Sequence, residues 1–191
     1  MLRTFLLCAV LAITSCFSAN AQERTTPQNA GSPKILIAFF SKTNNTRTVA
    51  EQIQTAIGGT LFQVTTKNPY PSDYRQTTEV ARKELDNNER PELAAIIPAE
   101  EMAQYDIIFI GYPIWWGTMP MAMFTFLEQY DLSGKTVVPF CTHGGSGLAR
   151  GPDDIRKLCP KSTVLQGLAV RSADRAQKEV TDWLDGLNFT R

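Results

Sequence analysis

The stretch KILIAFFSKTNNT, residues 34–46, joins a continuous apolar run to a cluster of hydroxyl and amide side chains. The apolar run at residues 34–40 predicts a buried strand, and the polar cluster lies where a helix should begin. Side-chain donors and the free N–H groups of a first helical turn would converge there, which is typical of a phosphate site. Ser, Thr and Asn are also ordinary helix caps, so this segment alone supports both interpretations.

Strand and helix patterns alternate from this segment to the end of the chain. Apolar runs predict four more strands, at residues 60–66, 105–112, 135–141 and 163–170. Apolar residues at helical spacing predict five helices, at residues 43–57, 74–88, 119–130, 152–158 and 176–187. Strands that alternate with helices form a parallel sheet covered on both faces. We therefore expect an α/β three-layer sandwich around a five-stranded parallel sheet.

The 191 residues, 43% of them apolar, suffice for one domain with a substantial core. Residues 1–21 combine a basic start, an apolar run and a final Ala-Asn-Ala, the pattern of a secretory signal peptide. Residues 22–33 read as a polar linker, which leaves residues 34–191 for the domain. Cys16 ends a sequence that resembles a bacterial lipobox, so the exported product is either periplasmic or attached to a membrane by a lipid at Cys16.

Three loops of unusual composition follow the first, third and fourth predicted strands. Ligands of parallel sheets bind at the carboxyl ends of the strands, beside the point where an order of 2-1-3-4-5 reverses. We therefore predict that these loops form one binding site. Its residues are Ser41, Lys42, Thr43, Asn44, Asn45 and Thr46; Pro113, Ile114, Trp115, Trp116 and Gly117; and Thr142, His143, Gly144, Gly145, Ser146 and Gly147.

The chemistry of the three loops suits a flavin nucleotide. The first would hold a phosphate, and the adjacent indoles of Trp115 and Trp116 would face a flat ring, although they could equally plug the core. The glycines of the third loop would bring backbone amides close to the pyrimidine edge of the ring, although a plain flexible turn has the same composition. One flavin would occupy all three loops at once.

The motifs SKTNNT, GYPIWWGTMP and PFCTHGGSG resemble those of the bacterial flavodoxin-like family, and the resemblance extends over residues 34–188. It implies a flavodoxin fold that binds one FMN non-covalently through the three loops. The direct passage from residues 163–170 into the last helix resembles the short-chain form. The family usually has glycine where this chain has Asn44. Asparagine tolerates left-handed backbone best after glycine, so we expect the loop conformation to be retained.

Three functions are compatible with this resemblance. The protein could be an electron carrier with a partner protein, an NAD(P)H-dependent reductase of quinones or similar small acceptors, or a module without turnover that binds flavin or acts as an apo interaction partner. His143, the single histidine, could supply a proton to an acceptor or hold its own loop by a backbone hydrogen bond. With 19 basic and 19 acidic residues the chain is neutral, so we expect a milder reduction potential than in acidic carriers.

Composition argues against several other functions. One histidine and two cysteines beyond the signal segment, Cys141 and Cys159, do not make a plausible zinc site. We expect these cysteines to be buried thiols rather than a disulfide. Lysine and arginine are scattered rather than clustered, so a nucleic-acid partner is not expected.

Overall fold

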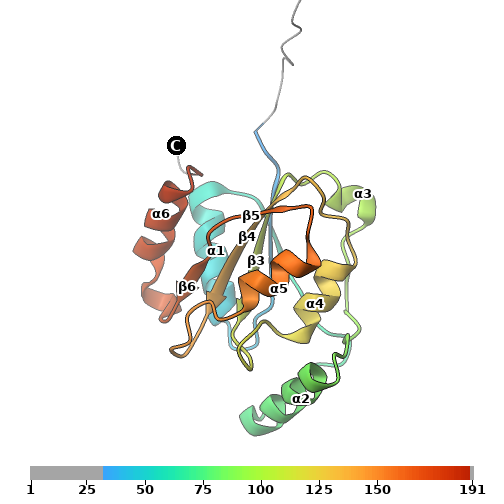
Figure 1. Ribbon diagram of the computed structural model, residues 1–191. Helices are drawn as coiled ribbons and strands as arrows, with labels where there is room; N and C mark the ends of the chain where they lie inside the picture. Colours follow the sequence, from blue (N-terminus) through green and yellow to red (C-terminus); the bar gives the residue numbers. More distant parts are fainter. Residues whose placement is uncertain (1–31, 190–191) are drawn as a thin grey trace, which may run out of the picture. The chain divides into compact units, whose positions relative to one another are not determined.

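The computed structural model describes residues 32–189, so the predicted signal peptide, the lipobox and most of the linker lie outside the described residues. The sheet has one order, β2-β1-β3-β4-β5, with every neighbouring pair parallel (Figure 1). This confirms the predicted order 2-1-3-4-5. The strands are β1 Ile35–Phe39, β2 Thr60–Gln63, β3 Ile107–Pro113, β4 Thr136–Thr142, β5 Thr163–Val164 and β6 Leu168–Val170.

The fifth predicted strand is broken in two. β5 and β6 both pair with β4 in parallel, and residues 165–167 separate them. Pro139 of β4 lies opposite this break, since a Cβ on Gly167 would be 3.0 Å from the carbonyl oxygen of Pro139. Proline has no N–H to donate to a neighbouring strand, which accounts for the interruption. The continuous strand predicted at residues 163–170 was wrong in this respect.

Helices cover both faces of the sheet, as predicted. α1 and α6 lie on one face, and α4 and α5 lie on the other (Figure 1). The helices are α1 Asn45–Ile57, α2 Tyr74–Asp86, α3 Ala99–Met102, α4 Met121–Glu128, α5 Gly151–Leu158 and α6 Gln177–Gly186, with a 3₁₀ turn, η1, at Ala173–Arg175.

Alternate residues of the central strands enter two separate cores. Leu36 and Ile108 pack toward α4 and α5, whereas Ile37 and Phe109 pack toward α1 and α6. All four side chains are fully buried. Both faces of each central strand therefore need apolar residues, which is why these strands appear as continuous apolar runs.

Helix α2 joins neither of these two layers. It lies beyond the carboxyl edge of the sheet, below the other helices in Figure 1. Its buried residues are Thr77, Ala81 and Glu84, and Tyr74 is 82% exposed. The sequence predicted the helix with its periodic residues Tyr74, Thr78, Ala81 and Leu85 on one face, but periodicity did not indicate its position.

Cys141 and Cys159 are both buried free thiols. Burial raises the pKa of Cys141 to about 12 and that of Cys159 to about 11, so both remain protonated and unreactive near neutral pH. The helices between residues 32 and 189 are all too short or too polar to cross a membrane. The same residues contain no group of three His, Cys, Asp or Glu side chains placed to hold a metal ion.

Tyr112 of β3 is fully buried, and its hydroxyl group has no hydrogen-bond partner among the described residues. A Cβ on Gly151 would lie only 2.3 Å from that hydroxyl oxygen, so the tight packing of α5 on β3 requires glycine at this position. Burial also raises the pKa of the Tyr112 phenol far above its ordinary value, which keeps it neutral.

We predict that Tyr112→Phe raises the free energy of unfolding by about 1 kcal/mol, because it removes a buried hydroxyl that makes no hydrogen bond. Tyr130→Phe is the control, since its hydroxyl bonds both the N–H of Ile97 at 2.9 Å and the C=O of Ile97 at 3.2 Å. That change should destabilise the protein by about 1–2 kcal/mol. Urea unfolding measures both, and a destabilised Tyr112→Phe protein would contradict the assignment.

Candidate functional site

A cleft of about 590 Å³ opens at the carboxyl edge of the sheet. Its volume lies in the range of roughly 300–1,000 Å³ that is usual for small-molecule sites. One side is formed by the loops after β1 and β3, and the other by α2. The residues that line it are Ser41, Lys42, Thr43, Asn45, Thr46, Ser72, Tyr74, Thr77, Thr78, Ala81, Pro113, Ile114, Trp115, Trp116 and Thr142.

The first loop enters α1 through a left-handed residue. Asn44 has a φ of 62° and a ψ of −7°, so asparagine occupies the conformation that glycine would otherwise favour. This confirms the expected loop conformation. Among the described residues, the N–H groups of residues 43–46 donate to no protein acceptor, whereas the N–H of Arg47 bonds the Ser41 hydroxyl at 3.3 Å. Four adjacent amide donors are therefore available to an anion.

A buried hydroxyl pair joins the first loop to the third. The Oγ1 atoms of Thr46 and Thr142 lie 2.9 Å apart, and both residues line the cleft. One hydroxyl donates to the other, so the proton of the accepting hydroxyl stays free for a ligand. The pair fixes the spacing of the two loops and adds a side-chain donor near the amides.

The second loop is a two-residue turn with a strained aromatic residue. Trp115 and Thr118 exchange backbone hydrogen bonds of 2.8 and 3.1 Å, and Trp116 and Gly117 between them have φ of 50° and 79°. Two positive φ angles in such a turn define type I′, which normally takes asparagine and glycine. A tryptophan in this conformation costs energy, and residues of this kind occur mostly at functional sites.

The two adjacent tryptophans have different surroundings, although both line the cleft. Trp115 packs edge-on against Phe40 and Tyr70, with ring centroids 5.3 and 5.0 Å away. Trp116 is 49% exposed, and its Nε1 donates to the carbonyl oxygen of Thr78 in α2 at 3.0 Å. Trp115 thus both closes the core and presents a surface to the cleft, while Trp116 connects the turn to α2.

Tyr70 connects this aromatic cluster to α2. Its hydroxyl donates to the carboxylate of Glu84 at 2.6 Å. Burial, and then the bond to Glu84, raise the pKa of Tyr70 above its ordinary value, and burial raises the pKa of Glu84. The phenol therefore stays protonated and keeps donating to Glu84.

The third loop contributes less to the cleft than the sequence predicted. Thr142 lines the cleft, but residues 143–147 do not, and neither do Asn44 and Gly117. The Nδ1 of His143 accepts hydrogen bonds from the N–H groups of Gly145 and Gly147, at 2.9 and 3.1 Å. His143 therefore holds its own loop, the second of its two predicted roles. These two amides are not free to bind a ring edge.

Five residues of the cleft, Ser72, Tyr74, Thr77, Thr78 and Ala81, were not predicted as site residues. Tyr74, Thr78 and Ala81 were predicted only as one helical face. The small and polar side chains of that face were the available signal, since a face packed on a sheet is normally more apolar.

The charge of the cleft suits an anionic ligand. Of the residues that line it, Lys42 alone is charged, and its ammonium group donates to the Ser72 carbonyl oxygen at 3.2 Å. No acidic residue lines it. A phosphate bound at residues 43–46 would therefore meet amide dipoles and one cation.

Comparisons with known proteins place these features in a family. A family model described as Flavodoxin matches residues 34–187. A candidate flavoprotein from Bacteroides eggerthii is 34% identical, with a TM-score of 0.72, and the match covers 81% of this chain and 98% of that one. A second candidate flavoprotein, from Bacteroides uniformis, is 30% identical over 80% of this chain and 98% of its own, with a TM-score of 0.71.

A flavoprotein from Lactobacillus acidophilus, solved in complex with FMN, is 25% identical. The match covers 77% of this chain and 98% of that chain, with a TM-score of 0.62. The comparison with curated proteins found no match.

We predict that His143→Ala speeds hydrogen exchange of the Gly145 and Gly147 amides by roughly tenfold, because each loses its acceptor. His143→Asn should largely preserve slow exchange, since an amide oxygen on a short side chain can accept from the N–H two residues ahead. Exchange measured by NMR reports both amides separately. Unchanged exchange in His143→Ala would show that the imidazole does not hold the loop.

Proposed function

The chain belongs to the flavodoxin family, and we propose that it binds FMN non-covalently in the cleft and transfers electrons through it. The similar Lactobacillus acidophilus flavoprotein was solved with FMN. Bound FMN would supply one-electron and two-electron redox chemistry, which none of the cleft side chains provides.

The observation that carries this proposal is the set of unpartnered amide donors at residues 43–46. They lie at the start of α1, where the helix dipole also favours an anion. The hydroxyl pair of Thr46 and Thr142 lies in the same cleft. A phosphate monoester fits this donor set, because it offers several acceptor oxygens and negative charge.

The rest of the cleft fits a flat ring. Trp115 supplies aromatic surface on one side, the Thr77, Thr78 and Ala81 residues of α2 form the other wall, and Trp116 joins the two sides through its bond to Thr78. Ala81 and the two threonines are small, so α2 can approach a planar ligand closely. In this proposal the chain binds, orients and shields the flavin, and no side chain acts as a catalytic acid or base.

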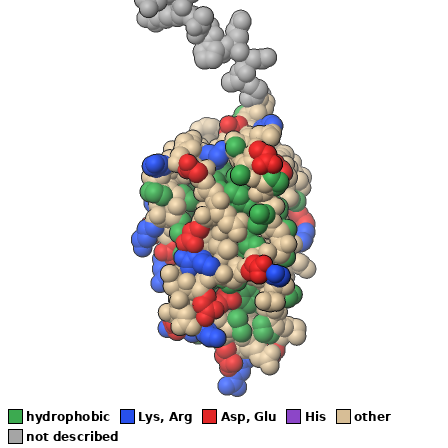
Figure 2. Space-filling model, turned by 90° about the vertical axis from the view of Figure 1, so that its right-hand side faces the viewer, with side chains coloured by type: hydrophobic (Ala, Val, Ile, Leu, Met, Phe, Trp, Pro, Cys, Tyr) green, Lys and Arg blue, Asp and Glu red, His purple; other side chains and the backbone are tan. Residues whose placement is uncertain are grey.

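Charge distribution bears on the redox properties. Figure 2 shows positive and negative side chains interspersed over one face of the molecule, with no extended area of a single sign. Such a surface steers charged partners only weakly. Because no acidic residue lines the cleft, reduced, anionic FMN would meet little repulsion, which supports a milder reduction potential than in acidic carriers.

We also propose that the protein is exported, on the strength of its N-terminal sequence alone. Cleavage after Ala21 would give a mature chain that begins at Gln22. Intact mass of the protein from a bacterial envelope fraction tests this. A lipid-modified chain that begins at Cys16 would show that the exported protein is anchored to a membrane. An uncleaved chain in the cytoplasm would refute export.

FMN titration tests the cofactor assignment. We expect one-to-one binding, with FMN bound roughly 100-fold more tightly than riboflavin, because riboflavin lacks the phosphate and two charge-assisted hydrogen bonds or more would be lost. Quenching of flavin fluorescence measures both affinities. Equal affinity for the two ligands would contradict phosphate binding at residues 43–46. If neither ligand binds, the cleft is not a flavin site.

Variants at Asn44 provide a matched pair for the same titration. Asn44→Gly should keep FMN affinity, because glycine adopts left-handed backbone freely. Asn44→Ala should weaken FMN binding by about tenfold, because left-handed backbone is unfavourable for alanine by roughly 1–2 kcal/mol. Riboflavin affinity should change little in either variant, since only the phosphate loop is altered.

A further inference from the structure

Helix α2 forms one wall of the cleft, yet it has little apolar anchorage. Of its three buried residues, two are Thr77 and Glu84, and the third is the small Ala81. Helix α4, by comparison, buries five apolar side chains in only eight residues. Burial of apolar side chains therefore contributes much less to holding α2 in place than it does for α4. The position of α2 depends on polar contacts instead.

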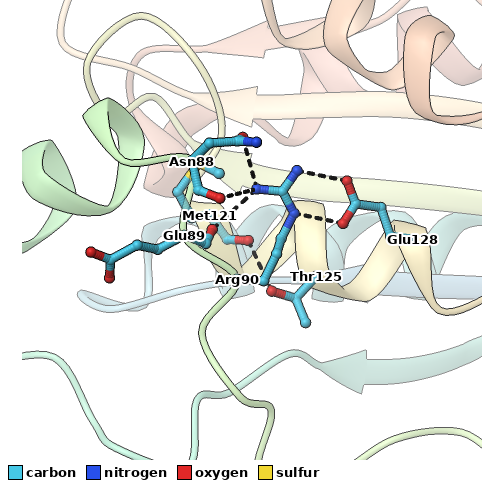
Figure 3. A network of polar contacts seen from close by, with 6 residues as sticks. All are labelled: Asn88, Glu89, Arg90, Met121, Thr125 and Glu128. Atoms are coloured by element: carbon cyan, nitrogen blue, oxygen red, sulfur yellow. Dashed lines mark hydrogen bonds and ion pairs between the residues drawn. The ribbon is translucent and has the colours of Figure 1, made fainter.

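The C-terminal end of α2 is firmly tied to the body of the domain. Beyond the helix, Arg90 donates to both carboxylate oxygens of Glu128 in α4, at 2.6 and 2.7 Å (Figure 3). The same guanidinium donates to the backbone and side-chain oxygens of Asn88, at 3.0 and 2.9 Å. Bidentate pairs of this kind fix geometry well, and the Tyr70–Glu84 bond adds a second tie at this end.

The first nine residues of α2, residues 74–82, are held very differently. Within the described part of the chain, their only hydrogen bond to a distant segment is the one from Trp116 Nε1 to the Thr78 carbonyl oxygen, at 3.0 Å. The guanidinium of Arg82 also lies over the Trp116 ring, 5.2 Å from its centroid. We call these two contacts of Trp116 with α2 the Trp116 latch.

The backbone of Trp116 shows that this latch is maintained at an energetic cost. Its φ of 50° places a bulky residue in the left-handed region, in a turn position that asparagine or glycine would occupy without strain. The side chain is also half exposed, so burial does not repay the strain. What the indole gains in this position is contact with α2.

We propose that Trp116 is a specificity-determining residue, because it latches α2 across the cleft and so excludes redox partners that must stack on the flavin. The inference rests on the proposed FMN site. A flat ligand between the turn at residues 113–118 and α2 is covered on both faces. A nicotinamide or quinone ring then has no face to stack on, whereas a protein that exchanges single electrons at the exposed rim needs none.

Direct hydride transfer from NADH to the flavin is the reaction that the latch would hinder. One NADH and one proton convert FMN to FMNH₂ and release NAD⁺, with two electrons and one proton passing directly from the nicotinamide ring. This transfer requires the two rings to be in contact. Opening of α2 is therefore required for it, and loss of the latch should accelerate it.

The first test uses hydrogen exchange of the full chain without FMN, so it does not depend on the cofactor. We expect Trp116→Phe, which loses the N–H donor but keeps a ring, to speed exchange of residues 74–82 by roughly fivefold, and Trp116→Ala to speed it by tenfold or more. Exchange in α1 should not change.

Trp183→Phe is the matched control. Its Nε1 also donates to a backbone carbonyl oxygen, that of Gln166, at 3.0 Å, but Trp183 belongs to α6, which packs beside α1 and does not line the cleft. The same chemical change there should leave α2 exchange unaffected. Unchanged α2 exchange in both Trp116 variants, or an equal increase in Trp183→Phe, would overturn the latch.

The second test measures the rate at which NADH reduces protein-bound FMN to FMNH₂ in a single turnover without oxygen, with FMN affinities determined separately. We expect slow reduction in the natural protein and a rate about tenfold higher in Trp116→Ala, with Trp183→Phe unchanged. Fast reduction in the natural protein, or no increase in Trp116→Ala, would overturn the specificity assignment. If the protein binds no FMN, the proposed function fails, and exchange of residues 74–82 still decides whether the latch exists.

Discussion

Because β1, β3 and β4 pair in parallel, their carboxyl ends lie at one edge of the sheet, and the loops that follow them have to meet there. The site depends on this constraint more than on any single side chain. It brings Thr46 and Thr142, 96 residues apart, within hydrogen-bond distance. It also sets the tryptophan turn beside the amides at the start of α1, so that phosphate chemistry and aromatic surface occur in one cleft.

The sheet was predictable because its physical cause is local. Residues buried on both faces must be apolar, so each central strand appeared as an apolar run. The conformation of Asn44 was also predictable, since few residues tolerate left-handed backbone. The break between β5 and β6 could have been inferred from Pro139, but only once the register of β4 with its neighbour was known.

The location of α2 was not predictable from the sequence. Its helical periodicity is clear, but periodicity identifies a face and not the surface that the face contacts. Tyr74 and Thr78 line the cleft, and one contact that holds the helix comes from Trp116, 38 residues away from Thr78 in the sequence. The role of His143 was one of two stated alternatives, because loop geometry decides whether a ring nitrogen accepts from its neighbours.

The segment that follows the C-terminal end of α2 is fixed by the contacts of Arg90, so a rigid rotation of the helix would pivot near that end. A helix of 13 residues is about 20 Å long, so a rotation of about 10° would displace its N-terminal end by about 3 Å. That N-terminal end begins beside Ser72, whose carbonyl oxygen is bonded by Lys42. Lys42 also belongs to the loop proposed to bind phosphate. An ammonium group has three N–H donors, so Lys42 can keep its bond to Ser72 and still offer a donor to an anion at this loop, which would join the start of the helix and the ligand through one cation.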